Sequence, residues 1–188
     1  WTYLNFVQYY GDREARNETG YSLAPKFFEI IVNRDPRFVN AHLILSTASS
    51  VYAGSPKQSV QHLETALNYI SPEINKDANF IWSTKAVDEL LFLGDVQAAQ
   101  HSFEMAAKWG LARGDELGKV MASRHQETAD FLANNPDSKK AQVSAWARIL
   151  NSVRDDETRQ KAIREIRELG GDVVQGEQGY RVVLPEED

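Results

Sequence analysis

One helical spacing recurs along the chain and limits its fold more than any other feature of the sequence. Three segments contain a triplet that starts with a small residue, reaches a large residue four positions later and ends three positions after that. The triplets are Ala24, Phe28 and Ile31; Ser59, Leu63 and Ala66; and Ala99, Phe103 and Ala106. Steps of three and four place residues on one helix face. Because small residues let helices approach and the large one fills the gap, we expect each triplet to pack its helix against neighbours.

Helical periodicity continues through most of the chain, and short connectors interrupt it. The connectors carry turn residues, as in "NRDPRF", "AGSPKQ", "ISPEIN", "LGD" and "NNPDS". The predicted helices cover residues 1–10, 23–34, 38–53, 56–70, 78–93, 96–109, 114–134, 138–153 and 156–169. Helices joined by short connectors lie antiparallel to their neighbours. The sequence therefore predicts a mostly α protein built from helical hairpins.

Strand-like alternation begins only after Gly171. Residues 173–175 and 180–184 are predicted to form a β-hairpin around "GEQG". The helix before it, 156–169, is expected to turn inward Ala162, Ile163, Ile166 and Leu169. A lone hairpin is marginally stable in water, so this one should lean on helix 156–169 or on helix 138–153. We expect the helix and hairpin to cap the open end of the helical array.

Residues 1–110 resemble the tetratricopeptide repeat family. Phe28 and Leu63 are 35 positions apart and Leu63 and Phe103 are 40 apart, near the family's period of about 34 residues. The matching positions are Trp1 and Leu4 in the first hairpin, Pro36 and Pro72 after the first two units, and Gly94 at the third turn. An insertion, "GDREARNETG", and a third unit without a closing proline depart from the pattern. The stretches "TGYSLAPKFFEIIVNRDPRF" and "DELLFLGD" also resemble a bacterial family found in cyanobacteria.

The resemblance implies an α-α superhelix with a binding groove. We expect three degenerate hairpins over residues 1–110, and further helices with the terminal cap over residues 111–188 of the same array. In the family, the first helix of each hairpin lines a concave groove that accepts a peptide. The corresponding partner-binding positions here are Tyr3, Phe6, Tyr10, Phe38, His42, Leu45, Ile81, Lys85, Asp88 and Leu91. The alternative for Tyr3, Phe6 and Tyr10 is packing in the core, where aromatic stripes usually lie.

The sequence offers no positive sign of catalysis or of a cofactor. Asp88 and Glu89 are adjacent, so a helix points them about 100° apart, and we expect them to be solvated or paired along the helix. The four histidines show no metal-binding spacing, and we expect them at the surface or in the groove. The chain contains no phosphate-binding loop and no nucleophile-elbow motif. A non-catalytic protein-binding or scaffold module, with no cofactor and no metal, is the function that the sequence favours.

DNA binding through residues 139–184 is the alternative. A helix followed by a hairpin is similar to the recognition helix and wing of winged-helix domains. Residues 156–169 carry four basic and four acidic side chains, and the whole chain has a formal net charge of −6. Nucleic-acid affinity depends on clustered Lys and Arg, so a nucleic-acid partner is disfavoured relative to a protein or peptide.

No apolar run approaches the 18 or so residues that a membrane span needs. The chain starts at Trp1 rather than Met, so we expect a segment to precede it, and a soluble part of an anchored or secreted bacterial protein fits this start.

Overall fold

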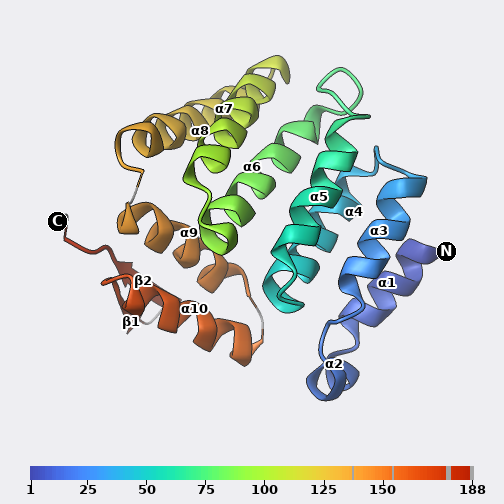
Figure 1. Cartoon of the computed structure of the whole chain (residues 1–188), viewed down its shortest axis with the longest axis horizontal. Helices are drawn as coiled ribbons and strands as arrows, with labels where there is room; N and C mark the ends of the chain where they lie inside the picture. The colour runs from blue at the N-terminus through green and yellow to red at the C-terminus, as the bar shows by residue number, and fades with distance from the viewer. Residues whose placement is uncertain (137, 154, 177–178, 187–188) are drawn as a thin grey trace. The chain divides into compact units, whose positions relative to one another are not determined.

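The helices of the structure, together with the short helical turns that continue two of them, begin and end within three residues of the ranges that the periodicity predicts, with one helix added. The computed structural model describes all residues except 137, 154, 177–178 and 187–188. The helices are α1 (Thr2–Gly11), α2 (Arg13–Thr19), α3 (Ala24–Arg34), α4 (Val39–Thr47), α5 (Pro56–Leu67), α6 (Asn79–Asp88), α7 (Val96–Ala112), α8 (Glu116–Asn134), α9 (Lys139–Ser152) and α10 (Asp156–Glu168). Three short helical turns, η1 (Ala48–Tyr52), η2 (Lys76–Ala78) and η3 (Glu89–Leu93), extend this set. The mostly helical class with a small C-terminal β-hairpin is confirmed (Figure 1).

The chain divides into two compact units, Trp1–Ala133 and Asn134–Asp188. The division falls at the end of α8, so the helix that follows the three hairpins belongs with them. The predicted division into residues 1–110 and 111–188 of one array stays a prediction.

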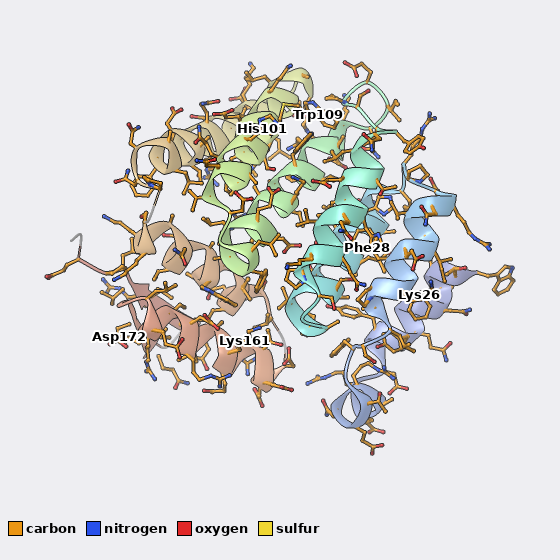
Figure 2. All side chains as sticks on the ribbon, in the orientation of Figure 1. Lys26, Phe28, His101, Trp109, Lys161 and Asp172 are labelled. Carbon is orange, nitrogen blue, oxygen red and sulfur yellow. The ribbon has the colours of Figure 1, made fainter. Side chains whose placement is uncertain are left out.

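Helices of the first unit pack in sequence order. α1 contacts α3, α4 contacts α5 and α6 contacts α7, which are the three predicted hairpins. Contacts between hairpins join α3 to α4 and α5, and join α6 to α4 and α5 (Figure 1). Every member of the three triplets is buried, and none exposes more than 5% of its surface. Figure 2 labels one of them, Phe28, whose ring lies 5.1 Å from that of His62 on α5.

Local signals in the sequence explain where the helices stop. Gly94 ends η3 with a φ of 65°, a left-handed conformation that glycine adopts without steric cost. The side chain of Asp95 then accepts a hydrogen bond from the backbone N–H of Ala98 at 3.0 Å and caps the start of α7. Gly94 therefore ends one helical segment and Asp95 begins the next, as the Gly-Asp pair in the sequence predicts.

Helix α2 was not predicted, because its sequence lacks apolar residues at helical spacing. It lies within the insertion, and none of its residues is buried. The guanidinium of Arg16 lies 3.9 Å from the ring centre of Tyr9 and donates to the carbonyl of Gly20 at 2.9 Å. The contact with Tyr9 of α1 and the hydrogen bond to Gly20 fix a helix that its own hydrophobic pattern does not specify.

The second unit has a core of its own. Strands β1 (Asp172–Gly176) and β2 (Gly179–Val183) pair antiparallel, with Val173 opposite Val182. Strand β1 packs on α10 and β2 on α9, as the instability of a lone hairpin predicts. The inward positions Ala162, Ile163 and Ile166 are buried, whereas Leu169 is only half-buried. The capping role of this unit stays a prediction.

Within the described part of the chain, none of the helices combines the length and the apolar character that a membrane span requires.

Candidate functional site

The first helices of the second and third hairpins end in the same unusual way. Helix α4 continues into η1 and α6 continues into η3, and both of these are π-helical turns of five residues. Such turns are rare in proteins and often lie at functional positions. Polar residues inside the first unit gather around these two turns.

The carboxyl group of Asp88 lies at the end of α6, in contact with serine side chains of α4 and α5. Its Oδ2 lies 2.8 Å from Ser59 Oγ and 3.2 Å from Ser46 Oγ, both within hydrogen-bonding range. The two serine oxygens lie 2.9 Å apart, and the hydroxyl of Ser50 in η1 donates to the backbone carbonyl of Ser46 at 2.8 Å. Burial raises the pKa of Asp88 to about 7, although the serine hydrogen bonds oppose this rise.

An ion pair lies next to this carboxyl group. Lys85 Nζ pairs with Glu89 one turn later, and both side chains are buried. Ser102 Oγ of α7 donates to Glu89 Oε2 at 2.6 Å and lies 3.3 Å from Lys85 Nζ. Glu64 of α5 approaches Lys85 Nζ to 3.4 Å from the more exposed side. This network joins α5, α6 and α7 through charged groups.

The expectation that Asp88 and Glu89 are solvated or paired along the helix is therefore wrong for Asp88. Each residue exposes 3% of its surface. The expected pairing along the helix is present for Glu89, through Lys85, but Asp88 is bonded across helices instead. A carboxylate can be buried only where other polar groups bind it, and those groups come from distant parts of the sequence.

Six of the ten predicted groove residues lie inside the first unit, so the expectation of groove exposure is wrong for them. They are Phe6, His42, Leu45, Ile81, Lys85 and Asp88, of which the first four are fully buried. The predicted groove faces of α1, α4 and α6 contact neighbouring helices, which leaves these side chains no surface to offer a partner.

The other four predicted residues keep some exposure. Tyr3, Tyr10, Phe38 and Leu91 are half-buried. The ring centres of Tyr3 and Phe38 are 4.8 Å apart, and those of Tyr10 and Phe6 are 5.5 Å apart. Tyr3, Tyr10 and Phe38 therefore pack against the edge of the core. For Tyr3 and Tyr10, this agrees with the alternative interpretation that they are core residues. A partner-binding role for these four stays a prediction.

The histidines are not all at the surface. His101 is exposed and His62 is half-buried, but His42 and His125 are buried, which contradicts the expected location for these two. Nε2 of His42 lies 3.0 Å from the carbonyl oxygen of Pro36, so this nitrogen carries a hydrogen and donates it. Among the described residues, no three His, Asp or Glu side chains are arranged to hold a metal ion.

An open hollow lies between α7 and α8, away from the predicted groove residues. Its volume is about 400 Å³, and its lining is mainly apolar. Ala107, Leu111 and Ala122 supply apolar surface, and polar or charged side chains surround it: Glu104, Lys108, Lys119, Ser123 and Gln126. Leu111 exposes 63% of its surface. The sequence reasoning missed this hollow, although Leu111 follows the last predicted residue of its helix by only two positions.

Known proteins provide no further assignment. Comparisons with protein-family models, with curated proteins and with solved structures gave no match. A functional interpretation of this chain rests on its own residues. The buried polar network and the α7–α8 hollow are the two features that such an interpretation has to explain.

Proposed function

We propose that residues 1–133 form a tetratricopeptide-like array that works as a non-catalytic protein-binding module. The single observation that carries the binding role is the apolar hollow between α7 and α8. The array interpretation is supported by the order of helix contacts, in which each hairpin packs on the next, and by the burial of all three triplets.

The hollow lies between two helices that approach each other closely. Gly110 of α7 and Gly118 of α8 face each other without side chains between them, and a Cβ at Gly110 would lie 3.1 Å from the carbonyl oxygen of Gly118. Ala122 follows one turn later on α8 and continues this small surface. Phe103 of α7 and His125 of α8 also lie close together, with ring centres 6.0 Å apart. The small side chains that line the hollow leave room for a larger side chain of a partner.

The chemistry of the rim indicates which segment would fit. Lys108 is exposed, and no ion-pair partner of it is found among the described residues. It lies one turn before Leu111 on α7, so an acidic group of a partner could pair with it while an apolar group covers Ala107 and Leu111. The partner that we propose is a protein segment with a bulky apolar side chain followed by a carboxylate. The apolar contact supplies affinity, and the charge pair selects the sequence.

A set of synthetic peptides of 12 residues tests this function. The peptides carry Leu, Phe or Ala at the centre and Glu or Lys at the next positions, and binding is followed by NMR shifts in backbone amides. We expect Leu-Glu and Phe-Glu peptides to shift amides of α7 and α8, and Ala-centred peptides to be inactive. Lys108→Glu should transfer the preference to the Lys-containing peptides.

Matched variants distinguish specific binding at this site from nonspecific binding to exposed apolar residues. Leu111→Asp should abolish peptide binding, whereas Leu4→Asp on α1 should not, although Leu4 is 61% exposed and Leu111 is 63% exposed. Equal losses in the two variants, or shifts confined to other helices, would contradict a binding site between α7 and α8.

A further inference from the structure

The contact between Asp88 and the two serines forms a closed ring of three oxygen atoms. Its sides are the three distances already given, 2.8, 2.9 and 3.2 Å, and each is within hydrogen-bonding range. The atoms come from α4, α5 and α6, so the ring lies where the second hairpin meets the third. Ser46 and Ser59 are fully buried.

Three hydrogen bonds in a ring of three oxygens require three hydrogen atoms. The hydroxyl groups of Ser46 and Ser59 supply two. The hydroxyl of Ser50 donates its hydrogen to the backbone carbonyl of Ser46 at 2.8 Å, so this hydrogen is not available to the ring. The third hydrogen can therefore come from the carboxyl group of Asp88 itself, but only in its protonated form.

Charges around the ring also favour a protonated Asp88. The nearest cation on its own helix, Lys85, is bound to Glu89, Ser102 and Glu64. Among the described residues, Asp88 has no ion pair. Ser46 and Ser59 contact it from α4 and α5, which pack against α6. The titratable groups on these elements are His42 on α4, Tyr52 on η1, Lys57, His62 and Glu64 on α5, Lys85 on α6, and Glu89 on η3. Helix α7, which also packs against α6, adds His101, Glu104 and Lys108.

We propose that Asp88 is a proton-binding site that controls how firmly α4 and α5 are held against α6. The protonated carboxyl group completes the ring and leaves the lysine and glutamate beside it as a neutral pair. Loss of the proton leaves a negative charge inside the first unit, with one hydrogen bond of the ring unmade. Local separation of α4 and α5 from α6 then lets water reach the charge, so a rise in pH favours separation.

The direction follows from proton linkage. The folded pKa of Asp88, about 7, is above its ordinary value of 3.8, so the closed contact holds the proton more tightly than the separated one. Between these two values the separated state gains up to about tenfold in population for each pH unit, and the gain ends above pH 7. His42 and His62 act in the opposite direction, because burial lowers the pKa of both and favours the closed state at higher pH.

Hydrogen–deuterium exchange of the whole chain from pH 5 to pH 7.5 tests the proposal, with rates corrected for the pH dependence of chemical exchange. Asp88→Asn is the matched variant, because its amide also donates but has no proton to lose. The ratio of wild-type to variant rates cancels the contributions of His42 and His62. We expect this ratio to rise at least about tenfold in α4, α5 and α6. Peptides from α9 and α10 provide the internal control.

A second measurement needs no replacement of Asp88. The carboxyl carbons of the aspartates are followed by NMR during a pH titration, and we expect one midpoint near neutral pH. Ser59→Ala removes a donor to the ionised carboxylate, so it should move that midpoint upward. The proposal is overturned if the exchange ratio stays flat, or if every aspartate of the wild-type chain completes its titration below pH 5.

Discussion

Gly118 of α8 lies so close to Gly110 of α7 that a methyl group at position 118 would meet the carbonyl oxygen of Gly110. It would also approach Cβ of Arg113 to 2.9 Å. The turn between the two helices is fixed by Asp115, whose Oδ1 accepts from the backbone N–H of Gly118 and from Nε of Arg113, both at 2.8 Å. The helices therefore meet through backbone atoms, which cannot move aside as a flexible side chain can.

Gly118→Ala should destabilise the first unit by about 1–3 kcal/mol, because the added methyl group forces α7 and α8 apart. Gly11→Ala, where nothing lies within 4 Å of the new Cβ, should be neutral or stabilise by up to about 1 kcal/mol. Urea unfolding measures both changes. Equal stabilities of the two variants would show that the helices are not in close contact at Gly118.

Lys85→Met should destabilise the chain by about 3–5 kcal/mol, since it leaves the Glu89 carboxylate buried without its cation. A double variant that also carries Glu89→Leu should recover part of this loss. The exposed pair Lys26 and Glu29, 2.7 Å apart, is the control. Figure 2 labels Lys26 on α3, where Lys26→Met should cost less than about 1 kcal/mol. A double-mutant cycle without coupling between Lys85 and Glu89 would contradict the buried pair.

His42 should make the chain less stable in mild acid. Burial lowers the pKa of its imidazole below the ordinary value of 6.5, so the unfolded chain binds a proton that the folded chain resists. The stability that His42 contributes is present above pH 6.5 and is lost as the pH falls from there toward the folded pKa. His42→Phe should weaken this dependence, whereas replacement of the exposed His101 by Gln should leave it unchanged. Urea midpoints at pH 5 and pH 7.5 give the comparison.

Neighbouring valines of β1 provide a paired test of the second unit. Val173 is 9% exposed and faces the helices, whereas Val174 is 49% exposed on the other side of the hairpin. Val173→Ala should destabilise this unit by about 1–3 kcal/mol, and Val174→Ala by less than about 0.5 kcal/mol. The unfolding of this unit is followed by the fluorescence of Trp146, which is buried in its core. The reverse order would mean that the strand packs through its opposite face.

The sequence by itself determined the positions of most helices, the hairpin and the residues that join helices within the core. Caps such as Asp95 and stops such as Gly94 act within a few residues, and the triplets repeat at the helical period, so each signal can be read locally. Helix α2 was missed because Arg16 and Tyr9, rather than an apolar face of its own, hold it in place.

Only the tertiary structure decided which face of the first helix of each hairpin is buried. It also decided which polar side chains contact one another. The predicted groove residues Leu45 and Ile81 lie in the core because helices from other hairpins cover them, and helical periodicity does not distinguish a covered apolar face from an open one. Asp88 bonds to serines 42 and 29 positions away in the sequence. Its burial and its altered pKa follow from those distant partners, since only the packing of three helices removes water from the carboxyl group and replaces it with hydroxyl groups.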